Sequence, residues 1–370
     1  MSIQAGLVGL PNVGKSTLFN ALTKSSVPAE NYPFCTIDPH LAITEVPDPR
    51  LENMAKLYGS KKTIPATVQF VDIAGLVKGA ASGQGLGNQF LGHIRDVHLI
   101  LHVLRCFEDP DIIKAEGTVD PIADYEVIVS ELMLKDLESV DKRLQRMDKL
   151  IKGAASKPAE KKELEAELSL LNQIYKALNA GDNNAVRSMV QQSTVQTVPL
   201  LSTKNFMIIA NLAEHEFEDD AYKNNPHYQA LVNRFGREMV IPVCAKVEYE
   251  LSQLSSEDAQ EMMGMIGLKE RSLDTIIRES YRHLGLITFF TLGPQEAHAW
   301  PIKKGITIRQ AAGEIHSDLE RGFICAEIFN YKDLAEFKQE AKLKEAGRMR
   351  TEGQDYLVQD GDIVHIKFNV

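Results

Sequence analysis

A glycine-rich segment carries the clearest chemistry in this sequence. Residues 9–16 read Gly-Leu-Pro-Asn-Val-Gly-Lys-Ser and match the pattern G-x-x-x-x-G-K-[ST]. Glycines let the backbone curl so that successive N–H groups point at phosphates, and a following helix adds its positive N-terminal end. We expect Lys15 to reach the β- and γ-phosphates and the hydroxyl of Ser16 to ligate Mg²⁺. The segment therefore predicts a nucleotide-binding site.

Two further segments could hold the metal ion and sense the γ-phosphate. Asp72-Ile73-Ala74-Gly75 follows an apolar run, so the Asp72 carboxylate can join the Mg²⁺ shell and the Gly75 N–H can meet the γ-phosphate. Thr36 is placed to close over the metal, although a threonine that only shapes a turn would look the same. Such segments order around a γ-phosphate and relax after hydrolysis. Frequent glycines after Asp72 favour this behaviour, at positions 75, 79, 83, 85 and 87.

The residue that would position the attacking water is missing from its usual place. Leu76 follows Gly75 where Ras-like enzymes have a glutamine, and a leucine side chain has no polar atom. Lys15 and the Gly75 N–H can stabilise phosphate charge, but we identify no catalytic base. Hydrolysis must therefore be slow or be organised by another group. Asn12 could hold a K⁺ ion near the phosphates, or it could only shape the loop.

A second loop has the position and composition of a base-reading segment. Asn211-Leu212-Ala213-Glu214 stands where a GTPase would have N-K-x-D. Asn211 can pair with the N7 and N6 edge of adenine, whereas Glu214 is one methylene too long to copy the aspartate contact to guanine. A site that loses such a contact loses most of its selectivity, so we favour ATP over GTP. Residues 244–246, Cys-Ala-Lys, occupy the place of another base-contacting loop.

Short apolar runs predict the strands that position these residues. Each run has the length of a buried strand and is followed by turn residues or a helical pattern. Strands that alternate with helices predict an α/β fold with a doubly wound parallel sheet. The runs are residues 3–10, 41–46, 68–71, 99–104, 206–210 and 240–243.

Two other regions depart from this alternation. Apolar residues recur at steps of three and four over 137–151 and 164–178, which predicts an antiparallel helical hairpin inserted in the domain. After about residue 285 the pattern predicts a small α+β module. Residues 300–308 are strand-like, residues 315–321 have a helical pattern, and apolar residues alternate over 364–370 as in a half-buried strand. The expected domains are a nucleotide-binding domain (1–127 and 199–284), a helical insertion (128–198) and a C-terminal domain (285–370).

Composition limits the classes of function. The 370 residues are 44% hydrophobic and 25% charged, with a formal charge of −10, as expected of a globular protein that does not bind nucleic acid through its whole surface. Four cysteines lie far apart, which favours a reducing compartment. His98 and His102 have the spacing of metal ligands, but no third ligand is near, so we expect buried histidines. Without a basic leader or a long apolar stretch, the sequence predicts a cytoplasmic protein with no membrane contact.

Taken together, these motifs resemble those of the YchF-type Obg-like ATPases, within the translation-factor class of P-loop NTPases. The resemblance runs along nearly the whole chain and implies slow ATP hydrolysis with Mg²⁺ and association with the ribosome or its RNA, with no DNA partner. It implies that the middle helices form a coiled coil and that the C-terminal part is a TGS-like β-grasp domain. It also implies that Leu212 contacts the base and that Ser16 and Thr36 ligate Mg²⁺. The residues implied to bind phosphate are Asn12, Val13, Gly14, Lys15, Ser16 and Thr17.

Two alternatives to an ATPase stay open. A GTPase of the same fold would need Glu214 to replace the usual aspartate. A binding adaptor whose nucleotide controls shape would need no efficient hydrolysis, which Leu76 allows. Basic and aromatic residues of the C-terminal module could contact RNA or form a solvated charged face.

Overall fold

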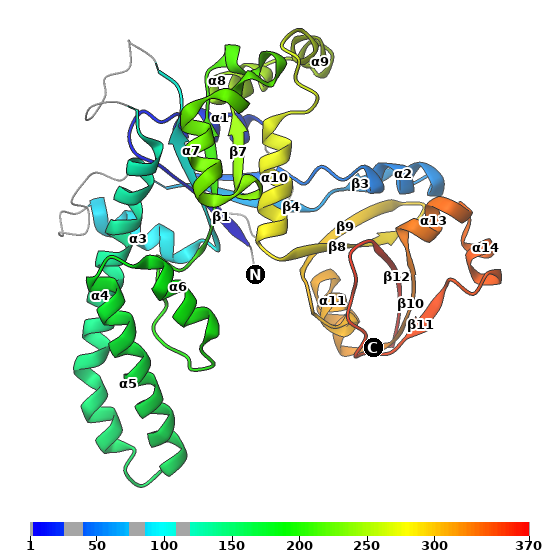
Figure 1. The fold of residues 1–370 in the computed structure, drawn as a ribbon. Helices are drawn as coiled ribbons and strands as arrows, with labels where there is room; N and C mark the ends of the chain where they lie inside the picture. The colour runs from blue at the N-terminus through cyan, green and yellow to red at the C-terminus, as the bar shows by residue number, and fades with distance from the viewer. Residues whose placement is uncertain (1–2, 26–39, 74–85, 109–118, 370) are drawn as a thin grey trace. The chain divides into compact units, whose positions relative to one another are not determined.

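The computed structural model describes residues 3–25, 40–73, 86–108 and 119–369, with the backbone alone for 86–89 (Figure 1). These residues form two compact units. The first unit takes the described parts of residues 1–24, 38–41 and 70–272, and the second takes those of residues 25–37, 42–69 and 273–370.

One six-stranded sheet has the order β2-β4-β1-β5-β6-β7, and its strands β1, β5, β6 and β7 belong wholly to the first unit. Strand β1 pairs in parallel with β5, β5 with β6, and β6 with β7. Every residue of β5 is buried, because a parallel sheet of this kind is covered on both faces. The predicted α/β fold is thus confirmed. The strands are β1 (Gln4–Val8), β2 (Leu41–Glu45), β4 (Thr67–Asp72), β5 (Leu99–Arg105), β6 (Asn205–Asn211) and β7 (Val240–Val243).

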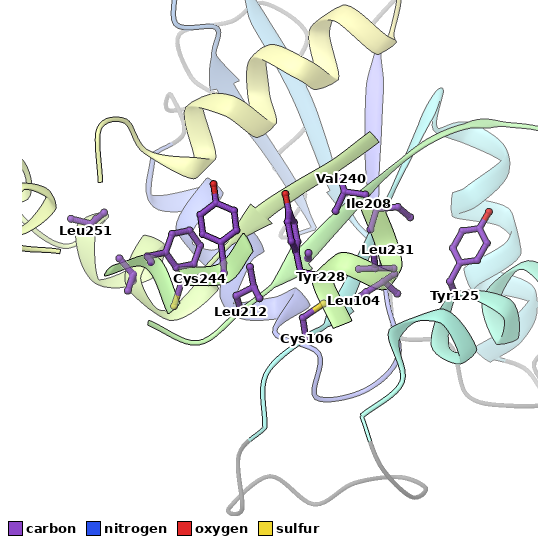
Figure 2. Packing of buried hydrophobic residues seen from close by; sticks show 14 residues of the cluster. Leu104, Cys106, Tyr125, Ile208, Leu212, Tyr228, Leu231, Val240, Cys244 and Leu251 are labelled. Carbon is purple, nitrogen blue, oxygen red and sulfur yellow. The ribbon is translucent and has the colours of Figure 1, made fainter. Parts of the chain in front are cut away.

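Helices follow the strands and bury their apolar faces. Figure 2 shows one core cluster, in which Leu104 and Ile208 of the sheet pack with Leu231 and Leu251 of helices. The helices of this part are α1 (Lys15–Lys24), α3 (Leu86–Asp96), α7 (Pro226–Phe235), α8 (Ala245–Leu251) and α9 (Ser256–Met265), with 3₁₀ segments η3 (Glu214–Asn224) and η4 (Arg237–Met239).

The predicted helical hairpin consists of α4 (Pro121–Gly153) and α5 (Pro158–Asn179), followed by α6 (Asn183–Gln192). Helix α4 begins seven residues before the expected boundary at 128, because Asp120 caps it by accepting hydrogen bonds from the N–H groups of its first turn. Its first turns pack in the core of the first unit through Ile128 and Leu132. Farther along, α4 pairs with α5 around Val140, Met147 and Leu171.

The second unit contains a mixed six-stranded sheet with the order β11-β10-β12-β8-β9-β3. Strands β8 and β9 form an antiparallel pair, and the last strand, β12, lies parallel to β8 at the centre of the sheet. This is an α+β module, and its strand order agrees with a β-grasp. The strands are β3 (Lys62–Ile64), β8 (Leu286–Leu292), β9 (Glu296–Lys303), β10 (Phe323–Asn330), β11 (Arg350–Glu352) and β12 (Asp362–Phe368).

The helices of the second unit include one from the N-terminal third of the sequence. They are α2 (Pro49–Tyr58), α10 (Ser272–His283), α11 (Ile308–Ile315), α12 (Ser317–Arg321), α13 (Tyr331–Phe337) and α14 (Glu340–Glu345). The strand expected over 300–308 ends at Lys303, because the side chain of Thr307 caps α11 and starts a helix at Ile308.

Residues 42–69 contribute α2 and β3 to this second unit, which the sequence did not predict. Strand β3 pairs in parallel with β9 at the edge of the sheet. Arg50 of α2 contacts the carboxylates of Asp48 and Asp360 at 2.8 and 2.7 Å and lies over the ring of Phe290. The compact units therefore do not follow the expected domain boundaries, which remain predictions. Within the described residues, no helix combines the length and apolar character that a membrane span requires.

Candidate nucleotide-binding site

The phosphate-binding loop lies between β1 and α1. Gly14 has a φ of +93° and Asn12 a φ of +64°, in the left-handed region that glycine adopts easily and asparagine tolerates. A Cβ on Gly9 would come within 2.8 Å of the carbonyl oxygen of Val103, and one on Gly14 within 2.2 Å of Nδ2 of Asn211. Gly9 is therefore required by the approach of the Val103 backbone, and Gly14 by its positive φ and the approach of the Asn211 side chain. The curled loop ends where Leu18 N–H donates to the Gly14 carbonyl in the first turn of α1.

Lys15 and Asp72 meet at the end of this loop. The Nζ of Lys15 donates to Oδ1 of Asp72, and both side chains are largely shielded from solvent. Asp72 is the last residue of β4, and its backbone N–H donates to the carbonyl of His40 at 2.9 Å. The exposed Ser16 lies beside Lys15 on the first turn of α1. The fold thus brings together three of the residues predicted to bind phosphate and metal.

Other predicted residues lie outside the described part of the chain. These are Thr36, Gly75 and Leu76, so the predictions about metal closure, the γ-phosphate contact and the missing glutamine stay predictions.

Asn211 braces the loop rather than presenting a free amide. Its Nδ2 donates to the carbonyl of Val13 at 2.9 Å, and its Oδ1 accepts from the N–H of Ala245 at 3.0 Å. The residue is 4% exposed. Both ends of the amide are therefore engaged within the protein, which gives Asn211 a positioning role in addition to any contact with a base.

A cavity of about 520 Å³ lies beside this brace, a volume suited to a small ligand. The segments that wall it come from the carboxyl ends of neighbouring parallel strands, where ligands of α/β proteins bind. The lining residues are Asn12, Gly14, Thr17, Phe107, Glu108, Asn211, Leu212, Ala213, Glu214, His215, Cys244, Ala245 and Lys246.

Three of these lining residues were not predicted from the sequence. Phe107 and Glu108 lie two and three residues after the end of β5, and His215 directly follows Glu214. Because all three residues follow predicted strands of the same sheet, the sequence could have indicated that they line the cavity. Leu212, by contrast, was predicted to contact the base, but it is 1% exposed and packs in the cluster of Figure 2. A contact with a base would use the small part of Leu212 that reaches the cavity wall.

An ion pair sits at the rim of the cavity. The Nζ of Lys246 lies 3.4 Å from Oε2 of Glu214 and 4.0 Å from Oε1 of Glu250, and all three side chains are substantially exposed. Glu214 raises the pKa of Lys246, so the ammonium keeps its proton at neutral pH. The cavity therefore offers a carboxylate acceptor and an ammonium donor next to each other.

Of the two histidines with metal-ligand spacing, His102 lies among aromatic rings. His102 is 2% exposed and packs edge-on against Tyr125 and Phe206, with ring centroids 4.9 and 5.8 Å away. Burial, together with the nearby Arg187, lowers the pKa of His102 to about 3. In the described residues, no group of three or more His, Cys, Asp or Glu side chains could hold a metal ion. His102 is buried, as the sequence predicted, whereas His98 is only partly buried and accepts a hydrogen bond from the Gln4 N–H at 3.4 Å.

Comparison with known proteins agrees with this geometry. A family model described as "50S ribosome-binding GTPase" matches residues 4–149, and the YchF-GTPase C-terminal model, described as a protein of unknown function (DUF933), matches residues 286–369. Curated relatives named "Ribosome-binding ATPase YchF" from Bacillus subtilis (strain 168) and Escherichia coli O157:H7 are 46% and 45% identical, over 100% of this chain and 100% of theirs.

A solved structure shows the same similarity in three dimensions. The Schizosaccharomyces pombe YchF GTPase has a TM-score of 0.84 and 36% identity, covering 99% of this chain and 98% of that chain. Similarity of sequence and fold over the whole length of both chains leaves one conclusion: this chain belongs to the YchF family of P-loop proteins.

Proposed function

We propose that this protein is a slow ATPase that acts as a nucleotide-controlled switch on the ribosome. The observation that carries the proposal is the continuity of the phosphate-binding loop with a cavity for the base, joined through Asn211. The names of the curated relatives, which are ribosome-binding ATPases, support the activity and the partner. A ribosomal partner implies a cytoplasmic location.

The loop residues fit a nucleotide with Mg²⁺. Ser16 is exposed at the N-terminus of α1, and the Asp72 carboxylate lies within reach of the loop through its ion pair with Lys15. Mg²⁺, held by Ser16, Thr36 and Asp72, would neutralise charge on the phosphate oxygens. The Asp72 carboxylate and the phosphates both draw on the three N–H donors of the Lys15 ammonium, so the ion pair competes with phosphate binding. Phosphate binding to Lys15 and metal binding to Asp72 therefore assist each other.

This competition predicts a measurable dependence on Mg²⁺. In the variant Asp72→Asn, Lys15 has no carboxylate partner, so ATP in the presence of EDTA should bind more tightly than it does to the natural protein. Calorimetric titration with and without Mg²⁺ measures the difference. Equal affinities in EDTA would show that the ion pair does not oppose phosphate binding.

The choice of base rests on Glu214 and Lys246. Guanine presents two N–H donors to a single carboxylate in GTPases, whereas here the carboxylate of Glu214 is longer and is drawn to an ammonium 3.4 Å away. Adenine presents an N6 donor beside an N1 acceptor, which suits an adjacent acceptor and donor. The competing assignment is GTP, which the name of the fission-yeast relative, a GTPase, favours.

Titration with non-hydrolysable ATP and GTP analogues decides between the two bases. We expect tighter ATP binding by the natural protein, and a gain of about tenfold or more in GTP affinity for Glu214→Asp, since recognition of a polar group supports large selectivity. Glu257→Asp, an exposed substitution on α9, is the matched control. Tighter GTP binding by the natural protein would make it a GTPase.

The adaptor alternative concerns hydrolysis rather than binding. Leu76 has no side chain that can orient water, so turnover must come from another group or from a partner. Steady-state ATP hydrolysis with and without added ribosomes separates the two: acceleration identifies a regulated ATPase, and unchanged turnover with nucleotide-dependent ribosome binding identifies an adaptor.

A further inference from the structure

One face of helix α4 carries a line of positive charge. Lys142, Arg146 and Lys149 are all exposed, and they follow one another at steps of four and then three residues. Residues at these steps are neighbours on the same face of a helix. With a rise of about 1.5 Å per residue, the three side chains extend along about 10 Å of the helix axis. These three residues are called the α4 ridge below.

The α4 ridge lies on the side of α4 that faces away from α5. The apolar residues of α4 that pack between the two helices include Val140, Leu144 and Met147. At 3.6 residues per turn, these positions lie about half a turn around the helix from the ridge. Figure 1 shows α4 and α5 side by side. The ridge therefore points to solvent and away from the carboxylates of α5.

Carboxylates neutralise other basic residues of α4 but not the α4 ridge. Lys135 pairs with Glu138 at 2.8 Å, and Arg143 pairs with Glu167 at 2.8 Å. Within the described residues, no carboxylate forms an ion pair with a member of the ridge. Like charges three and four residues apart destabilise a helix, and the chain as a whole carries a formal charge of −10. A local concentration of the opposite sign is therefore costly by itself and favours a polyanionic partner.

The surroundings of the α4 ridge distinguish a nucleic-acid backbone from an acidic protein. Over residues 138–149, all of which the structure describes, this face carries only polar side chains, among them Ser139 and Gln145. A protein interface has apolar or aromatic residues at its centre. Phosphates, in contrast, are bound by lysine, arginine, serine and glutamine. One strand of a duplex carries a phosphate about every 3 Å of helix axis, so the ridge can meet roughly three phosphates.

We propose that the α4 ridge docks along the phosphate backbone of a structured RNA. The choice of ribosomal RNA as its source rests on the function proposed above, whereas the ridge itself follows from the charges of α4. Contacts with phosphates fix a protein on the RNA without reading its sequence. Binding should therefore be independent of sequence and should weaken strongly with salt. The proposal places an RNA contact on the helical hairpin, apart from the basic residues of the C-terminal module.

Fluorescence anisotropy of a labelled RNA duplex of about 20 base pairs, titrated with the full chain over a series of KCl concentrations, tests the α4 ridge. The test variant combines Lys142→Gln, Arg146→Gln and Lys149→Gln, which removes three charges and keeps good helix-forming residues. Its affinity should fall more than tenfold at about 100 mM KCl. The slope of log K against log [KCl] should become shallower by about 2 to 3, since each lost phosphate contact contributes close to one unit.

A matched control removes the same charge from the other helix of the hairpin. The variant that combines Lys161→Gln, Lys162→Gln and Lys176→Gln loses three exposed positive charges of α5 and should keep both the affinity and the slope. Arg146→Lys keeps the charge and should bind like the natural protein, which a purely structural role of the guanidinium would not predict. Circular dichroism checks that every variant is folded.

Three results would overturn the proposal: an unchanged salt slope in the ridge variant, equal weakening in the α5 control, or tighter binding of poly-L-glutamate than of the RNA duplex. The last result would identify an acidic protein as the partner. Cosedimentation with ribosomes separates this proposal from the proposed function. If the natural protein and the ridge variant bind ribosomes equally, the ridge proposal fails and the proposed function stands. If the natural protein does not bind ribosomes but its binding of the duplex depends on the ridge, the proposed function fails and the ridge proposal stands.

Discussion

Replacing Asn211 with alanine tests how the nucleotide site is held together. The natural amide makes two buried hydrogen bonds, to the Val13 carbonyl at 2.9 Å and from the Ala245 N–H at 3.0 Å. Alanine removes both and leaves a buried carbonyl and a buried N–H without partners, since Val13 and Ala245 are 3% and 2% exposed. The substitution should therefore affect stability and nucleotide binding together.

The expected loss of stability follows from the two orphaned groups. Each buried donor or acceptor that loses its partner costs about 1–3 kcal/mol, so the variant should lose roughly 2–6 kcal/mol of unfolding free energy. Asn211→Asp refines the test. Its carboxylate still accepts from Ala245, but an oxygen replaces the donor that faces the Val13 carbonyl, so this nearly isosteric variant should also be destabilised at neutral pH.

Urea unfolding followed by far-UV circular dichroism measures the loss, and calorimetry with an ATP analogue measures the accompanying drop in affinity. The single tryptophan, Trp300, lies in the second unit and reports that unit separately by fluorescence. Asn172→Ala is the matched control, because Asn172 makes one exposed hydrogen bond within α5 and should cost less than about 0.5 kcal/mol. A loss below about 1 kcal/mol for Asn211→Ala, with unchanged affinity, would refute the reasoning.

Three other changes test neighbouring features. The buried His102 has a pKa of about 3 against an ordinary value of 6.5, so the unfolded chain takes up a proton first and stability falls as pH drops from 6.5 towards 3. At pH 5 this costs about 2 kcal/mol, and His102→Phe should abolish that part of the difference between urea unfolding at pH 7.5 and pH 5. Gly14→Ala should eliminate binding of an ATP analogue, because the new Cβ collides with Asn211 at a positive φ; near-natural affinity would show that the loop can move aside. If Asn12 helps to hold K⁺, ATP turnover should be faster in K⁺ than in Na⁺, and equal rates would exclude that role.

The features that the sequence predicted well are those specified locally. Apolar runs predicted all six strands of the first sheet, and the signal was strongest for β5, because a strand that is buried on both faces is apolar along most of its length. The phosphate-binding loop was predicted because its motif places glycine where the backbone takes a positive φ, a requirement of the local chain path. Gly14, with its φ of +93°, is such a case.

Features that depend on distant contacts were not predictable in this way. Asn211 bonds to Val13, 198 residues away, so the motif that contains it indicates proximity to a base but not the brace. Strand β3 has only three residues, Lys62–Ile64, too few for any periodic pattern, and it forms by adding to the edge of β9. The grouping of residues 42–69 with the second unit has the same origin: partners such as Asp360 for Arg50 are set by tertiary structure.

The brace also bears on how a base could influence hydrolysis. Val13 belongs to the loop predicted to surround the phosphates, and Ala245 precedes Lys246, which pairs with Glu214 at the rim of the cavity proposed to hold the base. One amide group therefore fixes the phosphate side and the base side of the site against each other. A base that displaces the segment at 244–246 pulls on Asn211 and hence on the loop. Selectivity between nucleotides should consequently appear in the rate of hydrolysis as well as in affinity, because catalysis depends on phosphate position far more steeply than binding does.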